Sequence, residues 1–364
     1  MFNNSHKVKR ITILYSKASG HSLACWKELK ARYNIELQVF HWKVSQDAPF
    51  ELNDLDWIDH IHMRENYNAQ QMIKLVQDFA PQGIYISGWM DRGYLEVAKA
   101  MKRKGTLIVS GLDGQWRGSV RQRLGCLTSS VYIHPAIDIL WVAGERQAQF
   151  AKRLGYSGAK CWHGLYCCDW EKFSASGAES SVERAKAFFY VGRYVVEKGI
   201  EELLTAYRVY RSQVENPWQL VCAGAGSMKN SFYGQEGLVD IGFIQPNELP
   251  DSLRGKASAF VLPSRKEPWG VVLQEAAASG LPLICSDACG ASVHLLQNGY
   301  NGFLFESGNA EHLAACMVKL HQASLSERLD MGRRSYDLSK QFTPQRWAMT
   351  FVRGIEDRLV NDES

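Results

Sequence analysis

Two glutamates eight residues apart, Glu267 and Glu275, are the side chains whose spacing most strongly suggests chemistry. Pro268 keeps Glu267 in extended backbone, because the residue before a proline avoids the helical region. The apolar residues that follow predict a helix from about Gly270 to Ser279. A carboxylate accepts hydrogen bonds from paired hydroxyl groups, so this arrangement suits a sugar on one side and a ribose on the other. A surface glutamate followed by an ordinary helix glutamate is the alternative.

Two cations, Arg193 and Lys198, follow Gly192 at the end of another predicted strand. Arginine binds phosphate through two parallel hydrogen bonds, and lysine acts as a point charge. The predicted helix start offers the backbone amides near Gly270 and Val271 to the same kind of anion. These groups together suit a diphosphate, whereas two solvated cations in a surface loop are the alternative.

A glycine turn, Gly224-Ala225-Gly226, follows a third predicted strand. A dinucleotide-binding fingerprint would carry a third glycine three residues later, where Lys229 stands instead. A tight turn between a strand and a helix therefore remains as good an interpretation as a ligand contact.

Short apolar segments alternate with helical segments in both halves of the chain. The predicted strands are residues 10–15, 35–42, 83–87, 106–109, 187–191, 218–223, 238–242, 259–262 and 281–285. Such alternation builds parallel sheets covered by helices. We therefore expect an α/β protein with two Rossmann-like, doubly wound domains that face each other across a cleft. Ligands of such sheets bind beyond the carboxyl ends of the strands.

The polar composition of residues 171–184 predicts a linker. It would separate an N-terminal domain, residues 1–170, from a C-terminal domain, residues 185–342. The last segment, residues 343–364, begins with Thr343-Pro344, which is typical of a helix start. Its apolar stripe consists of Trp347, Phe351, Ile355 and Leu359. This helix either packs on its own domain or crosses back to the first one.

Composition excludes several classes of protein. Hydrophobic residues make up 46% and charged residues 22%, close to the globular average. The net charge of +4 is too small to indicate a nucleic-acid partner. No apolar run approaches the roughly 20 residues of a membrane span, and the first residues lack the apolar middle of a signal peptide, so we expect a cytoplasmic protein. The nine cysteines form no Cys-x-x-Cys pair, so no metal site is expected.

The second half resembles the retaining glycosyltransferases of family 4, which have the GT-B fold. The resemblance extends over about residues 160–350 and keeps the family's order and spacing. It rests on VGRYVVEKG at residues 191–199, AGAG at 223–226, the E-x7-E pair at 267 and 275, SGLP at 279–282, NGYNGF at 298–303 and GLYCCDWEKF at 164–173. Residues 1–160 carry no strong motif of the family.

The resemblance implies a role for each matching residue. Arg193 and Lys198 would hold the diphosphate of a UDP- or GDP-linked sugar, Glu275 would bind the ribose hydroxyls, and Glu267 would contact the transferred sugar. The loop that contains Phe243 and Ile244 would lie near the base. The donor-binding residues expected on this basis are Gly20, Gly192, Arg193, Lys198, Gly224, Phe243, Ile244, Glu267, Gly270, Val271 and Glu275. The last helix would cross back onto the first domain.

The first half departs from the family pattern in two loops. The family's first loop carries adjacent glycines, but this chain has Ala18-Ser19-Gly20-His21. Where many members place a histidine, the loop after residues 106–109 instead contains Asp113. We treat Asp113 as the candidate for contact with the sugar or the acceptor, in a catalytic set with Glu267, Arg193 and Lys198, and His21 as its alternative.

The function implied is retaining, metal-independent transfer of a hexose to a glycan or lipid-linked acceptor in the synthesis of a surface polysaccharide or lipopolysaccharide. No paired carboxylates of the DxD type argue for a metal. A nucleotide-sugar epimerase, a glycoside phosphorylase and a non-enzymatic binding subunit are the alternatives. The basic stretch 99–126, with seven cations against one acid, suggests peripheral contact with an anionic membrane, although a solvated helix face explains it equally well.

Overall fold

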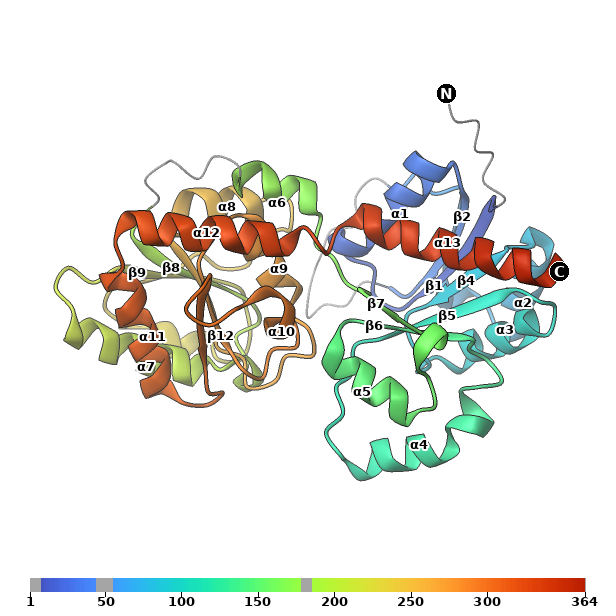
Figure 1. Ribbon diagram of the computed structural model, residues 1–364, viewed down its shortest axis with the longest axis horizontal. Coiled ribbons are helices and arrows are strands. Elements are labelled where there is room, and N and C mark those ends of the chain that lie inside the picture. The colour runs from blue at the N-terminus through green and yellow to red at the C-terminus, as the bar shows by residue number, and fades with distance from the viewer. Residues whose placement is uncertain (1–7, 44–54, 178–184, 364) are drawn as a thin grey trace. The chain divides into compact units, whose positions relative to one another are not determined.

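The computed structural model describes residues 8–43, 55–177 and 185–363 of the chain. Two compact units make up this part of the protein, and each contains its own parallel sheet (Figure 1). Unit 1 comprises Met1–Cys167 together with Pro344–Ser364, and unit 2 comprises Cys168–Thr343. The chain thus leaves unit 1 once and returns to it for its last helix.

Seven strands form the sheet of unit 1: β1 (Arg10–Tyr15), β2 (Glu36–His41), β3 (His60–Met63), β4 (Gly83–Ile86), β5 (Leu107–Leu112), β6 (Ile139–Val142) and β7 (Cys161–His163). Their spatial order is β3-β2-β1-β4-β5-β6-β7, and all neighbours run parallel. Strands β4, β5 and β6 are buried along their whole length, as expected for a parallel sheet with helices on both faces.

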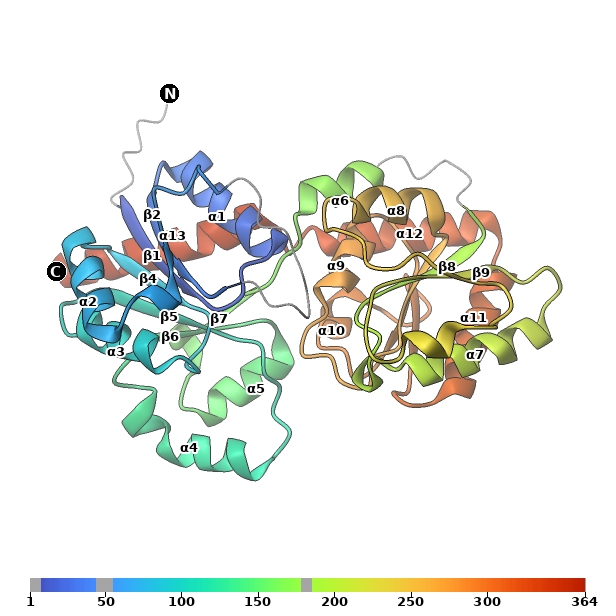
Figure 2. The same cartoon turned by 180° about the vertical axis from the view of Figure 1, so that it is seen from behind.

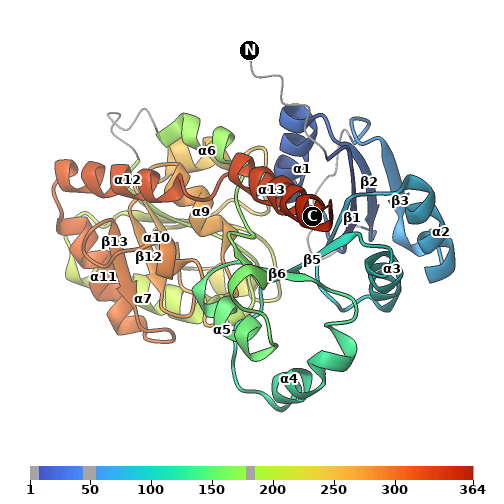
Figure 3. The ribbon, with the colours of Figure 1, turned by 45° about the vertical axis from the view of Figure 1, so that its right-hand side comes forward.

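The helices of unit 1 are α1 (Gly20–Tyr33), η1 (Arg64–Asn66), α2 (Ala69–Phe79), α3 (Arg92–Lys102), α4 (Val120–Tyr132), α5 (Glu145–Arg153), η2 (Gly158–Lys160) and α13 (Pro344–Glu363). On one face of the sheet, α2, α3 and α5 bury Met72, Val97 and Phe150 in a common core. On the other face α1 and α13 lie side by side (Figure 3). Helix α4 lies at the periphery of the unit.

The final helix, α13, packs on unit 1 through aromatic side chains. The Trp347 ring stacks on Trp141 of β6, with the ring centroids 4.7 Å apart and an interplanar angle of 18°. Phe351 approaches Tyr85 of β4 edge-on, with the centroids 6.2 Å apart. Both α13 residues are buried. The prediction that this helix crosses back to the first domain is confirmed.

Six strands form the sheet of unit 2: β8 (Ala187–Val191), β9 (Gln219–Ala223), β10 (Leu238–Asp240), β11 (Ala259–Leu262), β12 (Leu283–Ser286) and β13 (Gly302–Phe305). Their order is β10-β9-β8-β11-β12-β13, again with all neighbours parallel. Because the strands are parallel, the loops after β8, β9, β10 and β11 all start at one edge of the sheet.

The helices of unit 2 are α6 (Trp170–Gly177), η3 (Val196–Lys198), α7 (Ile200–Gln213), η4 (Lys229–Phe232), α8 (Leu249–Lys256), α9 (Val271–Ala278), α10 (Ser292–Leu295), α11 (Ala310–Gln322) and α12 (Leu325–Ser339). Helices α7 and α11 pack together and bury Leu203 and Met317 in one core (Figure 2). Helix α9 packs against α6 and α12.

The segment expected to be a linker, residues 171–184, is partly helical. Residues 170–177 form α6, and residues 178–184 lie outside the described residues. The Trp170 indole donates a hydrogen bond to the Ser339 hydroxyl at 2.9 Å, and Phe173 is buried. These two aromatic side chains give a segment of mostly polar composition enough apolar surface to pack, which its composition alone did not indicate.

Gly354 of α13 should not tolerate a larger side chain. A Cβ atom at this position would lie 2.0 Å from the Trp162 ring, well inside van der Waals contact. We expect Gly354→Ala to lower the free energy of unfolding by about 1–3 kcal/mol, the usual cost of overpacking.

The matched control is Gly125→Ala in α4, where nothing lies within 4 Å of the added Cβ. Alanine is favoured over glycine inside a helix, so this variant should keep or slightly raise the melting temperature. Thermal unfolding of both variants measures the difference, and equal melting temperatures would contradict the packing argument.

Candidate functional site

Three loops of unit 2 come into backbone contact at the carboxyl edge of its sheet, and glycines make this possible. Gly224, with φ of 156°, leaves no room for a side chain, because a Cβ atom would lie 1.9 Å from the Gly192 carbonyl oxygen. Gly199, with φ of 69°, is restricted in the same way, because a Cβ atom there would lie 2.1 Å from the Pro263 carbonyl oxygen. The Gly224-Ala225-Gly226 segment is therefore a tight turn, and it lets the loop after β9 pack directly against the loop after β8.

An ion pair between Lys198 and Glu267 joins the loop after β8 to the loop after β11. The Glu267 residue is only 7% exposed. The Ser264 hydroxyl donates to the same carboxylate oxygen, Oε2, at 3.3 Å, and the Ser264 carbonyl accepts from the Ser286 hydroxyl at 2.6 Å. A buried carboxylate is strongly destabilising unless it is paired. The cation and the hydroxyl therefore fix where this carboxylate points.

The backbone around Glu267 is anchored to the loop after β12. The Glu267 carbonyl accepts from the Gly290 amide at 3.1 Å, and the Trp269 carbonyl accepts from the Ala291 amide at 2.9 Å. Trp269 is itself buried. The loop that carries the carboxylate is therefore anchored at Glu267 and at Trp269, so the fold sets its geometry.

Helix α9 begins directly after this loop, with Gly270 as its N-cap residue at φ of 100°. The amides of the first helical turn, at Val271 and Val272, have no acceptor within a helix. They carry the positive end of the helix dipole, which favours an anion. The predicted helix start is thus placed next to the Lys198–Glu267 pair.

Arg193 lies in the loop after β8, which also leads to Lys198. The Tyr190 hydroxyl donates to the Arg193 carbonyl at 3.0 Å. Burial holds the pKa of Tyr190 well above its usual range, the charge of Glu267 raises it further, and the charge of Arg193 lowers it. Both charges therefore act on the Tyr190 hydroxyl, whereas direct contact within this set joins Lys198 to Glu267.

Glu275 lies further along α9, beside Asp169. Burial raises the pKa of Glu275 to about 7, and the neighbouring Asp169 charge adds to this shift. Asp169 immediately precedes α6, which packs on α9, and it forms a 2.7 Å ion pair with Lys172. The sequence did not indicate this acidic neighbour.

The loop with Phe243 and Ile244 starts beside the glycine turn. The Gly242 carbonyl accepts from the Gly224 amide at 2.8 Å, and the Gly242 amide donates to the Asp240 carboxylate at 2.9 Å. Phe243 is exposed and Ile244 is half-buried. These two apolar side chains thus belong to a loop that lies next to the loop after β9.

Unit 1 contains a separate cavity of about 200 Å³ at the carboxyl edge of its own sheet. The ends of β1, β4 and β5, the start of α1 and the segment after β7 form its walls. Its lining residues are Tyr15, Ser16, Lys17, His21, Tyr85, Ser87, Gly111, Asp113, Leu165 and Tyr166. Hydroxyl groups and aromatic rings dominate this surface, which suits a small polar ligand with hydroxyl groups.

Asp113 and His21, the two candidates from the first half of the sequence, both line this cavity. The Tyr166 hydroxyl donates to Asp113 Oδ2 at 3.2 Å, and the His21 ring meets Tyr166 edge-on at 5.6 Å. Burial lowers the pKa of His21 to about 4, so its imidazole is neutral at pH 7. Gly20 begins α1 one residue earlier but is not part of the cavity wall.

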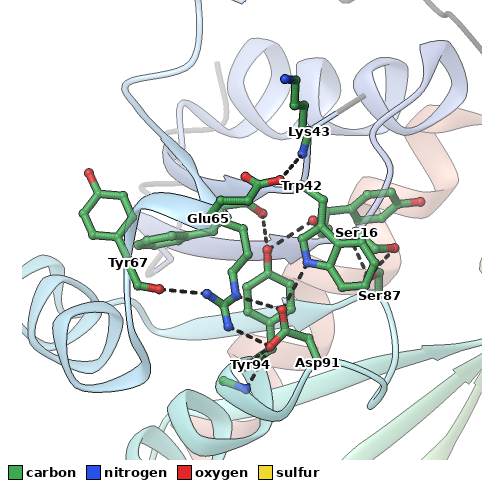
Figure 4. Close-up of polar contacts among 12 residues, drawn as sticks. Ser16, Trp42, Lys43, Glu65, Tyr67, Ser87, Asp91 and Tyr94 are labelled. Carbon is green, nitrogen blue, oxygen red and sulfur yellow. Dashed lines mark hydrogen bonds and ion pairs between the residues drawn. The ribbon is translucent and has the colours of Figure 1, made fainter. Parts of the chain in front are cut away.

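A polar network supports the cavity from the side of β2 to β4 (Figure 4). Ser87 donates to the Ser16 hydroxyl at 3.2 Å, and the Tyr94 hydroxyl donates to the carbonyl just before Ser16 at 3.2 Å. Asp91 caps the helix that contains Tyr94 and binds Arg64 through two hydrogen bonds of 2.7 and 3.0 Å. These contacts hold the cavity-lining Ser16 and Ser87 in place.

Sequence reasoning missed the hydroxyl-bearing residues at both sites. Tyr15 and Ser87 are the last residues of predicted strands, and Ser264 lies just beyond a third. Their position at carboxyl strand ends was the available signal, because ligands of parallel sheets bind there. Single serines and tyrosines are common at such positions, so they indicate a site less clearly than charged residues in a motif do.

Among residues 8–43, 55–177 and 185–363, no group of three or more His, Cys, Asp or Glu side chains is arranged to hold a metal ion. None of the helices in these ranges has the length and apolarity that crossing a bilayer requires. The arrangement in unit 2 combines cations and helix amides for an anion with a fixed carboxylate for hydroxyl groups.

His21 should make unit 1 sensitive to acid. Because the pKa of His21 is about 4 in the fold and ordinary in the unfolded chain, the unfolded state binds more protons between pH 6.5 and 4. The free energy of unfolding should therefore fall as pH drops through this window. His21→Gln should lose less melting temperature than wild type between pH 7 and 5. The exposed His163→Gln is the control, and parallel pH profiles for all three proteins would contradict the burial of His21.

Glu275 should give stability the opposite dependence on pH. Its pKa of about 7 means that the folded state keeps a proton that the unfolded state releases above about pH 4.3. Stability should thus decline as pH rises from about 4.5 to 7 and level off above that. Glu275→Gln removes this decline, so its gain in melting temperature over wild type should be larger at pH 8 than at pH 5. The control is Glu311→Gln at an exposed position, whose difference in melting temperature from wild type should be the same at both pH values. The same result for Glu275→Gln would refute the raised pKa of Glu275.

Comparison with known proteins identifies part of the chain. Residues 172–337 match the family model described as "Glycosyl transferases group 1". CapM, a capsular polysaccharide biosynthesis glycosyltransferase of Staphylococcus aureus, is 31% identical over 146 residues, which cover 38% of this chain and 38% of CapM. The lipopolysaccharide 1,6-galactosyltransferase of Escherichia coli is 33% identical over 132 residues, which cover 34% of this chain and 36% of that enzyme. The chain thus spans well under half the length of these curated relatives.

Solved structures resemble nearly the whole chain. Anabaena HepE in complex with UDP and glucose superposes with a TM-score of 0.70 and 14% identity, covering 96% of this chain and 99% of that one. At this identity the likeness shows the fold alone. It confirms the expected GT-B class, with two parallel-sheet α/β domains and a C-terminal helix. The chain therefore has the GT-B fold, and its residues 172–337 match the glycosyl transferases group 1 model.

Proposed function

We propose that this protein is a retaining glycosyltransferase that moves a hexose from a UDP- or GDP-linked donor to a glycan or lipid-linked acceptor in the synthesis of a cell-envelope polysaccharide. Unit 2 would bind the donor, and unit 1 would bind the acceptor. The observation that carries the proposal is the contact of Lys198 with Glu267, beside Arg193 and the N-terminus of α9. The relatives named for capsular and lipopolysaccharide synthesis support it, as does HepE, solved with UDP and glucose.

The donor diphosphate would bind to Arg193, Lys198 and the first amides of α9. An ammonium group has three donors, so Lys198 can contact Glu267 through one and phosphate oxygens through the others. Gly192 and Gly224 would let the chain approach the donor closely, because neither carries a side chain. Phe243 and Ile244 would pack near the base, and Glu275 would accept hydrogen bonds from the ribose.

Transfer begins when the bond between the sugar and the diphosphate breaks. Positive charge develops on the sugar and negative charge on the leaving phosphate, which the cations and helix amides stabilise. Glu267 would hold a sugar hydroxyl while this happens. The departing phosphate oxygen takes the proton of the acceptor hydroxyl on the same face, and the acceptor oxygen forms the new bond to the sugar. This scheme needs no metal, because the cations neutralise the leaving group.

The cavity of unit 1 would serve the sugar or the acceptor. Asp113 would accept a hydrogen bond from a hydroxyl group, oriented by Tyr166. Neutral His21 could donate or accept a hydrogen bond at the same cavity. Peripheral contact with an anionic membrane would give access to a lipid-linked acceptor. An epimerase, a phosphorylase and a binding subunit without turnover are the outcomes against which the proposal is tested.

Incubation with UDP- and GDP-hexoses tests the reaction directly. Nucleotide release that requires a cell-envelope extract as acceptor supports transfer. An altered free nucleotide sugar without acceptor would indicate an epimerase, dependence on inorganic phosphate would indicate a phosphorylase, and binding without turnover would indicate a non-enzymatic subunit.

Variants separate the roles of the two glutamates. Glu267→Gln should lower turnover about 10²–10³-fold, the usual effect of losing one preorganised contact, and should weaken nucleotide binding less than it lowers turnover. Glu275→Ala should instead weaken nucleotide binding, because the ribose loses its acceptor. Steady-state kinetics and calorimetry measure the two effects, with Glu311→Gln as control. Unchanged kinetics and binding in both variants would refute the site.

A further inference from the structure

Helix α4 of unit 1 exposes an apolar stripe to solvent. Its most exposed side chains include Leu127 at 78% and Val120 at 74%. The stripe, which we call the α4 stripe, consists of Val120, Leu124, Leu127 and Val131. These positions are spaced by four, three and four residues, so at about 100° per residue they fall within a sector of about 60° on the helix. They form one continuous apolar line along the helix.

The opposite side of α4 is the one that meets the rest of unit 1, and it is small and polar. Ser129 is the single buried residue of the helix, while Gln122 and Cys126 are half-buried. Surface helices normally turn their apolar face toward the core. In α4 this polarity is inverted, and packing within unit 1 does not explain the stripe. Figures 1 and 3 show this helix at the periphery of the unit.

Arginines flank the stripe. Arg121 and Arg123 project on either side of it by the same helical geometry, and Arg117 precedes the helix. All three are exposed. The sequence from Gly114 to Ile137 contains no aspartate or glutamate. An apolar line between cations is typical of helices that lie in the interface of a membrane with anionic lipids.

The remaining cations of the basic stretch 99–126, which are Lys99, Lys102, Arg103 and Lys104, lie in or directly after α3 rather than in α4. Lys102, for example, forms an ion pair with Asp138 at 2.9 Å and donates to the carbonyls of His134 and Ile137 at 2.8 and 2.7 Å. The charge of Lys102 is therefore neutralised by a partner within unit 1. The relevant surface is therefore narrower than the stretch that the sequence indicates, and its apolar component was not visible from charge alone.

We propose that the α4 stripe, with Arg117, Arg121 and Arg123, docks unit 1 on an anionic phospholipid bilayer. A second copy of this chain is the weaker candidate, for two reasons. Four side chains on one helix fall far short of the roughly 20–30 residues a side of a stable protein interface. A paired α4 would also bring arginines together without an acidic residue on the helix to neutralise them. The inference does not depend on the proposed transfer reaction.

Vesicle flotation of the full chain tests this docking surface. Wild type should bind vesicles of mixed phosphatidylcholine and phosphatidylglycerol, bind pure phosphatidylcholine much less, and dissociate as salt is raised. Leu124→Glu combined with Leu127→Glu should reduce binding at least about tenfold, because two apolar anchors become charges of the wrong sign. Arg121→Gln combined with Arg123→Gln should weaken binding to the anionic vesicles and reduce its salt dependence.

Leu325→Glu is the matched control, since Leu325 is also an exposed leucine, 48% exposed, at the start of a helix in unit 2. It should bind vesicles as wild type does. Nucleotide binding and melting temperature should be unchanged in all variants, which separates loss of docking from misfolding and from failure of the donor site.

Three results would overturn the proposal. Wild type could fail to bind anionic vesicles, or the α4 variants could bind them as wild type does. Sedimentation could also show a dimer that the Leu124→Glu, Leu127→Glu variant converts to monomers, in which case a second copy covers the stripe.

Discussion

The ion pair between Lys198 and Glu267 is the contact on which the candidate donor site depends. A carboxylate with so little access to water is stable only beside a positive charge and hydrogen-bond donors. Lys198 and Ser264 supply both, from two loops that the sheet of unit 2 brings together. The pair thereby fixes the ends of those loops in the absence of any ligand. A diphosphate would meet an arrangement already formed, which lowers the cost of ordering the site on binding.

Both units place their candidate residues by the same geometric device. Parallel strands deliver every loop to one edge of a sheet, and residues without side chains let neighbouring loops touch. In unit 2, Gly199 and Gly224 pass carbonyl oxygens at distances that no other residue would allow. In unit 1 the analogous edge holds a cavity lined by tyrosines and serines, supported by the Arg64–Asp91 pair. The two sites therefore differ in chemistry: an ion pair is central to the first, whereas hydroxyl groups and aromatic rings make up most of the second.

Much of the fold could be predicted from the sequence, because alternating apolar and helical segments specify parallel sheets. The helix after Gly270 was predicted almost to the residue, since Pro268 and Gly280 mark its limits. The sequence could not reveal α6, a helix in a mostly polar segment that packs against α8, α9 and α12. It also could not reveal that Asp169 lies beside Glu275, or that α4 turns its apolar side outward, because both depend on contacts between distant segments.

The return of the chain to unit 1 at Pro344 has a consequence for how the protein is made. Trp141 and Tyr85 on the sheet of unit 1 lack their α13 partners until Trp347 and Phe351 have been synthesised, after the whole of unit 2. All of unit 2, by contrast, leaves the ribosome before α13 does. Unit 2 can thus complete its core first, while the sheet of unit 1 still lacks the helix that covers its aromatic face. During that interval the nascent chain would need protection from aggregation.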